Sequence, residues 1–252
     1  MFPLRDENPA IHRSVVTFLL VAINVIVWVF VQKLGSDPAL SQSVWNYGLI
    51  PGELLGRVEP GTQVMVGKRV LAVLDGISKW WTVLTSMFMH GDWMHIIGNL
   101  WFLVVFGDNV EDAMGPLRFA LFYILCGVAA AGAQIASDPD STLPMIGASG
   151  AIGGVMGAYL RLYPRVRVQM LIFLGFFIRI VPVPAFLMLA YWFVLQLVSG
   201  AVSGGTGGVA FWAHVGGFSA GFLLVKLFCS RSRLAAIRFR REAAWTLPSD
   251  RF

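Results

Sequence analysis

The sequence predicts an all-α membrane protein: one six-transmembrane helical bundle with a long external loop after the first span. Two features of the composition support this class. Apolar residues make up 57% of the 252 residues and the mean hydropathy is +0.71, whereas charged residues make up only 13%. A soluble domain carries about twice that share of charged residues, roughly 25%. Lipid rather than water is therefore expected to surround most of this chain.

Six apolar stretches are long enough, or nearly long enough, to cross a bilayer, which takes about 20 helical residues. They cover residues 15–32, 93–107, 117–136, 149–162, 183–200 and 209–228. Glycines crowd the start of the fourth stretch, and such a helix suits close contact with other helices better than contact with lipid. We therefore expect the fourth stretch at the centre of the bundle.

The distribution of basic residues predicts the orientation. With a cytoplasmic N-terminus, 14 of the 19 Lys and Arg residues fall on the cytoplasmic side and 5 on the other, in agreement with the positive-inside rule. The chain then divides into a cytoplasmic segment 1–14, a six-helix membrane domain 15–228 and a basic cytoplasmic tail 229–252. The tail is either solvated or bound to anionic lipid headgroups. Because topology explains the net charge of +5, no nucleic-acid partner is expected.

Two connecting segments do not read as spans. The external segment 33–80 mixes prolines and glycines with interfacial aromatic residues, and the alternation within 62–74 allows a short hairpin. The segment 164–182 is apolar in its middle, but Arg179, Pro182 and Pro184 interrupt it. We interpret it as a cytoplasmic or interfacial stretch rather than a seventh span. Cys126 and Cys229 lie in or at the end of apolar runs and are expected to be reduced.

Polar side chains occur at four places within the apolar stretches, where such groups usually face the bundle interior and have a role. These places are Asn24, the pair His95 and Asn99, Ser149, and His214. Each alone has an ordinary explanation, such as a serine bonded to a backbone carbonyl or a histidine that only packs. His95 and Asn99, however, are four residues apart and share one helix face. Because alternate spans run in the same direction, the last four side chains are expected at one depth near the outer surface.

These four side chains suit acyl-transfer chemistry. A serine hydroxyl is a poor nucleophile near neutral pH and needs a base, and His214 can take the proton of Ser149 and return it to the leaving amine. Developing negative charge on the oxygen then needs hydrogen-bond donors. The amide of Asn99, an imidazole N–H of His95 and the backbone N–H of Ser149 are the candidates.

The arrangement expected is a dyad rather than a triad, because no acidic residue lies in these stretches at the same depth. A ring from Tyr159 or Tyr191 could orient the histidine instead. Small residues indicate that the helices pack closely: Ser149, Gly153 and Gly157 form a stripe, and Gly217 with Gly221 gives a G-x-x-x-G spacing.

The quoted residues resemble the motifs of the rhomboid family of intramembrane serine proteases. The G-x-S-G nucleophile motif is matched by Gly147-Ala148-Ser149-Gly150. The final-span A-H-x-x-G motif is similar to Ala213-His214-Val215-Gly216-Gly217 with Gly221. His95 with Asn99 resembles the H-x-x-x-N of the second span, and residues 106–112 resemble the loop that follows that span. The similarity runs from about residue 80 to residue 225, and the motifs occur in order at family-like spacing.

The resemblance implies a rhomboid-like fold with Ser149 as nucleophile, His214 as base, and His95 and Asn99 as oxyanion donors beside the Ser149 backbone. Gly147, Gly150, Gly153, Gly217 and Gly221 would support the motifs and their packing. The partners would be membrane lipid and transmembrane protein substrates, cut near the outer surface. The segment 204–208 would correspond to a mobile cap, and no metal or cofactor is implied. The compact chain suits a multi-pass protein of a bacterial inner membrane.

Three other interpretations are open. A pseudoprotease of the same fold would bind membrane clients without cleaving them, although such proteins usually lack the serine or the histidine. A transporter or channel could use the histidines to relay protons, but no inverted repeat is evident. A metal protease is disfavoured because no H-E-x-x-H occurs. His90 is expected to support the bend before the second span, and His12 to be solvated.

Overall fold

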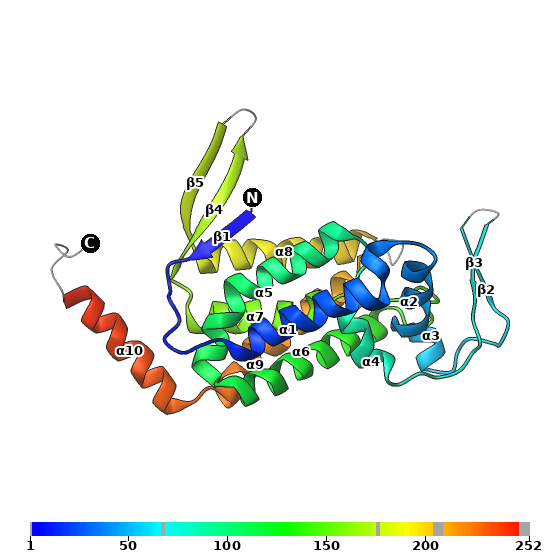
Figure 1. Cartoon of the computed structure of the whole chain (residues 1–252), viewed down its shortest axis with the longest axis horizontal. Helices are drawn as coiled ribbons and strands as arrows, with labels where there is room; N and C mark the ends of the chain where they lie inside the picture. The colour runs from blue at the N-terminus through cyan, green and yellow to red at the C-terminus, as the bar shows by residue number, and fades with distance from the viewer. Residues whose placement is uncertain (1, 67–68, 175–176, 204–208, 247–252) are drawn as a thin grey trace.

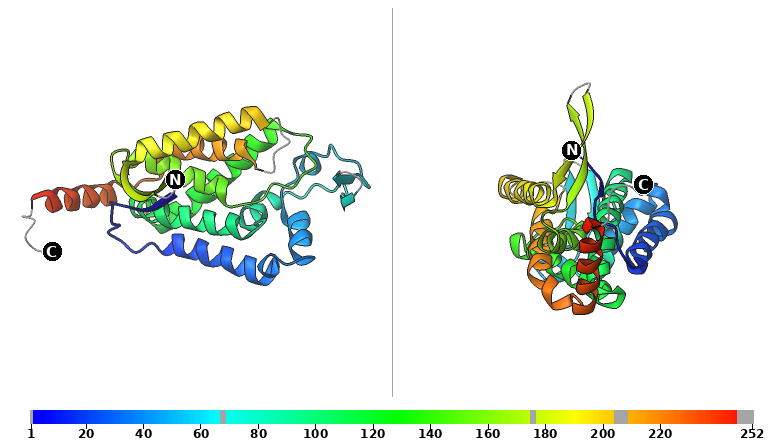
Figure 2. Two further views of the ribbon diagram at one scale, coloured as in Figure 1. Left: turned by 90° about the horizontal axis from the view of Figure 1, so that it is seen from above. Right: turned by 90° about the vertical axis from the view of Figure 1, so that its left-hand side faces the viewer.

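The computed structural model describes residues 2–66, 69–174, 177–203 and 209–246, and its main body is an elongated bundle of helices (Figure 1). Helices occur at each of the predicted spans. They are α1 (Val15–Ile26), continued by the π-helical turn η1 (Val27–Val31), α5 (Trp93–Met114), α6 (Pro116–Ser137), α7 (Ser149–Leu162), α8 (Ala185–Ser203) and α9 (Phe211–Phe228). Figure 2 shows from two further directions that they run side by side.

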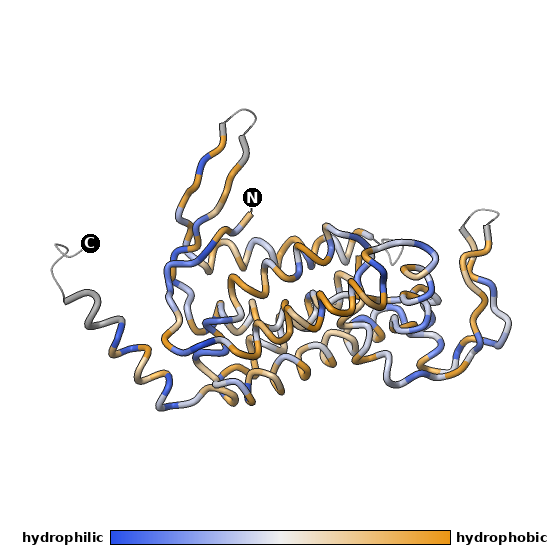
Figure 3. The backbone as a smooth tube through the Cα atoms, viewed as in Figure 1, coloured by the Kyte–Doolittle hydropathy of each residue, from blue (hydrophilic) through white to orange (hydrophobic). Residues whose placement is uncertain are grey.

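Three of these helices, α6, α8 and α9, are long and apolar enough to cross a membrane. The remaining three differ from them in length or polarity. Val15–Val31 is apolar but shorter, α7 has 14 residues, and the last turns of α5 carry Asp108, Glu111 and Asp112. Hydropathy along the backbone is drawn in Figure 3. A bundle of six spans therefore stays a prediction, while the mostly helical membrane fold agrees with it.

α7 lies at the centre of the bundle, as its glycines predict. Every residue from Gly150 to Tyr159 is buried. A Cβ added at Gly217 of α9 would lie 1.9 Å from the carbonyl oxygen of Gly150, and one at Gly221 would lie 1.9 Å from that of Gly154. No side chain fits at these distances, so glycine alone allows the α7 and α9 backbones to touch.

The segment between η1 and α5 forms a small lobe at one end of the bundle. It contains η2 (Lys33–Gly35), α2 (Ala39–Tyr47), α3 (Pro51–Leu54), β2 (Gln63–Val66), β3 (Arg69–Val73), α4 (Thr82–Thr85) and η3 (Ser86–Phe88). The hairpin predicted within 62–74 is confirmed, because β2 and β3 pair antiparallel. Ile50, Val58, Val64 and Leu74 form a separate small core beneath it.

The all-α prediction is incomplete at the opposite end of the bundle. There β4 (Arg167–Leu174) and β5 (Phe177–Pro184) form an antiparallel hairpin, and β1 (Phe2–Asp6) adds a third strand in the order β1-β4-β5. Val168 and Met170 are buried while the intervening Gln169 is not, which is the period of two expected of a strand. The hairpin stands across the direction of the helices in Figures 1 and 2, so this segment is not a seventh span.

Described segments near the two termini both contact α5. Trp101 of α5 donates a hydrogen bond from Nε1 to the carbonyl oxygen of Pro3, at 2.5 Å. His12 is exposed, as expected of a solvated side chain, but its Nδ1 also lies 2.5 Å from Oδ1 of the buried Asp112. After α9, the basic tail forms α10 (Arg231–Thr246), and Ile237 within it is buried against the bundle. Cys126 and Cys229 are free thiols.

Candidate active site

Ser149 is the first residue of α7, and the residues before it turn the chain into the helix. Gly147 has a φ of +119°, a backbone conformation that residues with a Cβ rarely adopt. A Cβ on Gly147 would also lie 2.6 Å from Nε2 of His95 and 3.5 Å from Oγ of Ser149. The glycine of the G-x-S-G motif is therefore required both for the turn and for the close approach of the histidine.

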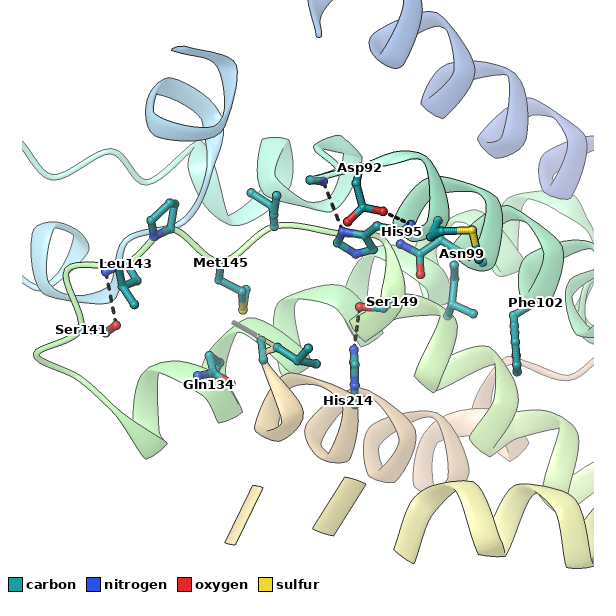
Figure 4. A pocket seen from close by; sticks show the side chains of 18 of the residues that line it. Asp92, His95, Asn99, Phe102, Gln134, Ser141, Leu143, Met145, Ser149 and His214 are labelled. Atoms are coloured by element: carbon teal, nitrogen blue, oxygen red, sulfur yellow. Dashed lines mark hydrogen bonds between the residues drawn. The ribbon is translucent and has the colours of Figure 1, made fainter. Parts of the chain in front are cut away.

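Ser149 and His214 are brought into hydrogen-bond contact although 65 residues separate them in the chain. Nε2 of His214 lies 2.7 Å from Oγ of Ser149 (Figure 4). His214 is the fourth residue of α9, one turn before Gly217, where the α7 and α9 backbones touch. A Cβ on Gly153 would lie 3.2 Å from the carbonyl oxygen of His214. The glycine contacts of the two helices therefore hold the hydroxyl and the imidazole together.

The other ring nitrogen of His214 contacts a residue of α8. Nδ1 of His214 lies 2.8 Å from Oε1 of Gln196. One helical turn earlier, the ring of Trp192 lies 5.7 Å from the imidazole ring between centroids, tilted by 38°. The ring packing against His214 that was expected from Tyr191 or Tyr159 is therefore supplied by Trp192. Tyr191 is exposed, and the hydroxyl of Tyr159 donates to the carboxyl group of Asp6.

His95 and Asn99 lie on the face of α5 that is turned toward Ser149 (Figure 4). The side chain of Asp92 caps α5 by accepting the backbone N–H of His95 at 2.8 Å. Nδ1 of His95 accepts the backbone N–H of Gly91 at 3.3 Å. In a neutral imidazole the proton must then reside on Nε2, which is the nitrogen beside Gly147 and Ser149. His95 is therefore arranged as a donor toward the serine.

Asn99 supplies a second donor. Its Nδ2 atom is buried and has no hydrogen-bond partner among the residues that the structure describes. A buried donor without a partner costs about 1–3 kcal/mol, so a native protein normally retains one only for a purpose. From its place in the cavity wall, Nδ2 can donate to a group that enters the pocket.

The start of α7 adds backbone donors. The first hydrogen bond that closes this helix runs from the N–H of Ile152 to the carbonyl oxygen of Ala148. The N–H groups of residues 149–151 precede it and have no acceptor within the helix. They carry the positive end of the helix dipole and favour negative charge beside Ser149.

These groups line one cavity of about 610 Å³. Its wall includes Ser149, His214, His95, Asn99 and Trp192, together with apolar side chains such as Met145. A cavity of this size can hold a short peptide segment or a drug-sized ligand. No group of three or more His, Cys, Asp or Glu side chains suited to a metal ion occurs among the described residues.

The remaining predicted residues have other places. Gly150 lies against Ala130 of α6 and, like Gly217 and Gly221, takes part in the backbone contacts. Asn24 donates to the carbonyl oxygen of Leu20 on its own helix and does not reach the site. His90 is fully buried before α5, and its ring lies 5.1 Å from that of His95. The predicted cap at 204–208 falls outside the described residues.

Sequence reasoning missed Gln196 and Trp192. A signal was present, because Gln196 is a polar residue inside an apolar stretch and Trp192 precedes it by four residues. The rule that singled out the other polar side chains applies equally to Gln196.

Comparison with known proteins agrees with this geometry. A family model described as the Rhomboid domain matches residues 78–231. YdcA of Bacillus subtilis (strain 168), named as a candidate rhomboid protease, is 30% identical over 146 residues, covering 58% of this chain and 61% of that protein. Rhomboid protease GluP of the same organism is 27% identical over 144 residues, covering 57% and 24%. Inactive RHOMBOID-like protein 8 of Arabidopsis thaliana is 35% identical over 80 residues, covering 32% and 22%.

This chain therefore spans less than two thirds of the length of each of these relatives. The matched region nevertheless runs from the segment before α4 to the start of α10 and contains Ser149, His214, His95, Asn99, Trp192 and Gln196. Because the family model covers more than half of the 252 residues, and apolar helices form the same region, this chain belongs to the rhomboid family and is an integral membrane protein.

Proposed function

We propose that this chain is an intramembrane serine endopeptidase that hydrolyses peptide bonds of transmembrane protein substrates near the outer membrane face. Its family includes proteins named as rhomboid proteases. The observation that carries the proposal is the distance of 2.7 Å between Nε2 of His214 and Oγ of Ser149. That distance lies within the range a nucleophile and its base need for proton transfer, about 2.6–3.2 Å.

In this mechanism Ser149 attacks the carbonyl carbon of the scissile peptide bond while Nε2 of His214 takes the hydroxyl proton. The tetrahedral intermediate collapses as the imidazolium returns that proton to the leaving amine. The acyl group then remains bonded to Oγ. A water molecule, deprotonated by the same imidazole, attacks the acyl carbon. The bond from that carbon to Oγ then breaks, the imidazolium returns its proton to Oγ, and the product leaves with a new C-terminal carboxyl group.

The negative oxygen of each tetrahedral intermediate needs donors aimed at its position. The Nε2–H of His95, the unpartnered Nδ2 of Asn99 and the N–H of Ser149 at the start of α7 serve this purpose in our proposal. These donors would stabilise the oxyanion most where water is excluded, because electrostatic interactions are stronger in a low-dielectric site.

The proposed setting follows from the distribution of charge. The N-terminus and α10 would lie on the cytoplasmic side of a bacterial inner membrane, with six spans between residues 15 and 228 and lipid around them. The basic tail 229–252 would face anionic headgroups or solvent. Substrate helices would enter from the bilayer with their outer ends toward the cavity.

The experiment compares the full-length protein with Ser149→Ala and His214→Ala in proteoliposomes. A fluorophosphonate probe should label the native protein covalently, and neither variant should be labelled. A helical transmembrane reporter peptide should be cleaved by the native protein only. Labelling that survives Ser149→Ala unchanged contradicts the proposal. Reporter binding without cleavage by any form would instead identify a protein that binds membrane segments without cleaving them; one relative is named as inactive.

A further inference from the structure

We infer that Gln196 is a positioning residue of the catalytic site: its carbonyl oxygen accepts the Nδ1–H of His214 and so keeps Nε2 unprotonated toward Ser149. The inference rests on the proposed function and deepens it. It replaces the expected dyad by a Ser149–His214–Gln196 arrangement whose members come from α7, α9 and α8.

The chemistry of the two contacts requires one tautomer of His214. A neutral imidazole has one N–H and one acceptor nitrogen. To remove a proton from Ser149, Nε2 must be the acceptor, so Nδ1 must carry the hydrogen and needs an acceptor of its own. Oε1 of Gln196 lies 2.8 Å from Nδ1. If the amide of Gln196 were reversed, its NH2 group would donate to Nδ1 and the imidazole proton would have to reside on Nε2. A protonated Nε2 could not act as a base toward Ser149.

The neighbouring residues make this contact specific. Gln196 and Trp192 are four residues apart and therefore share one face of α8. Trp192 covers the imidazole ring, with 5.7 Å between ring centroids, while Gln196 takes the ring nitrogen. Exposed apolar residues adjoin both, since Tyr191 and Leu195 are turned away from the bundle. α8 thus presents one polar side chain to the site and apolar side chains outward.

The chemistry of the acceptor suits a membrane setting. In soluble serine proteases the orienting group is a carboxylate, and an ionised carboxylate in the bilayer interior is costly. A neutral amide oxygen fixes the tautomer without adding a charge. It also stabilises the transient imidazolium less than a carboxylate would, so its removal should cost less than the loss of a triad aspartate.

Three variants separate positioning from packing. Gln196→Met keeps a flexible side chain of similar size without an acceptor oxygen, and Gln196→Glu keeps the acceptor. Leu195→Met is the control, because it also introduces a methionine but on the outward face of α8. With a transmembrane reporter in proteoliposomes, we expect Gln196→Met to lower kcat about tenfold, as for the loss of one hydrogen bond, with KM within about twofold. Gln196→Glu should recover most of the rate, and Leu195→Met should match the native protein.

A spectroscopic measurement tests the same contact without proteolysis. In protein with 15N-labelled histidine, assigned by comparison with His214→Ala, the native His214 should give the signals of an Nδ1-protonated neutral ring. Gln196→Met should shift the population toward the Nε2-protonated form. If the native protein neither labels nor cleaves, the proposed function fails while this measurement still decides the role of Gln196.

Two results would overturn the inference. One is a Gln196→Met variant with native kcat and an unchanged tautomer signal. The other is a loss of activity in Gln196→Met that Gln196→Glu does not restore, together with a lowered unfolding temperature, which would mark Gln196 as a packing residue only.

Discussion

The α7–α9 pair and α8 contribute to the same site but are held in the bundle in different ways. α7 buries ten of its 14 residues, and its backbone touches that of α9 at Gly150 and Gly154. Only four of the 19 residues of α8 are buried: Ala185, Met188, Leu189 and Gly200. α8 meets α9 through side chains, as in the stacking of Phe193 on Phe218, with ring centroids 4.6 Å apart.

This difference separates two requirements of the proposed chemistry. Ser149 and His214, the proposed nucleophile and base, lie on two helices whose relative position is tightly restricted. Their backbones touch at glycines, so no side chain at the contact can rearrange. Their orienting partner stands on a helix whose residues lie mostly at the surface of the bundle. A change in α8 should therefore alter the rate while the fold survives, whereas a change in the α7–α9 contact should damage both.

The largest effect is expected from Gly217→Ala. The added Cβ would lie 1.9 Å from the carbonyl oxygen of Gly150, so the two helices must separate. Overpacking of this kind costs about 1–3 kcal/mol and occasionally more. We expect a lowered free energy of unfolding, measured by thermal unfolding in detergent, and loss of fluorophosphonate labelling.

Gly200→Ala on α8 is the matched control. Its Cβ would meet side-chain atoms of Trp212 and Phe211 at 3.2 Å and 3.3 Å rather than backbone. The gain in helix propensity, about 1 kcal/mol, should offset this contact. Equal unfolding temperatures for Gly217→Ala and Gly200→Ala would contradict the claim that the α7–α9 contact tolerates substitution less well than α8 does.

The second effect, on rate alone, is expected from Asn99→Ala. Loss of one oxyanion donor lowers kcat by about 10²-fold or more. Nδ2 of Asn99 has no partner among the described residues, so its removal should not lower stability. Reporter cleavage and thermal unfolding are measured together, with the exposed Ile97→Ala on the same helix as control. A native rate in Asn99→Ala would remove Asn99 from the site.

The smallest expected effect is a pH dependence of stability that arises at the C-terminal end of α7. Asp6 of β1 accepts the hydroxyl hydrogen of Tyr159, and Asn109 donates to the same carboxyl group at 3.0 Å. Burial raises the pKa of Asp6 from 3.8 to about 7. Because the folded pKa is higher than the unfolded pKa, this contribution to stability is complete below about pH 4 and is lost as the pH rises to about 7.

Asp6→Asn keeps an acceptor for Tyr159 but cannot ionise. The loss of stability between pH 4 and pH 8 should therefore shrink, on the order of 1 kcal/mol given the partial exposure of Asp6. Thermal unfolding across that range measures it, and Gln196→Met should leave the slope as it is in the native protein. An identical pH dependence in native protein and Asp6→Asn would show that ionisation of Asp6 does not weaken its contact with Tyr159 of α7.

Much of the fold was accessible from local patterns. The six helix ranges follow from apolar length, and the central place of α7 follows from its glycines. The hairpin β4–β5 was missed because residues 170–178 form a continuous apolar run in which no alternation shows. The added strand β1 was missed because its pairing joins residues more than 150 positions apart, as in Phe2 with Leu171. The contact of His12 with Asp112 was not expected for a similar reason, since 100 residues separate the two.

The sequence by itself determined the membrane class and singled out Ser149, His214, His95 and Asn99 as candidate groups, because spacing along a helix and motif order are local properties. Only the tertiary structure decided which face of α8 meets the imidazole, and hence that Gln196 rather than a tyrosine ring or a carboxylate adjoins Nδ1. The rotation of one helix against another depends on the packing of all its neighbours, and no run of residues within α8 encodes it alone.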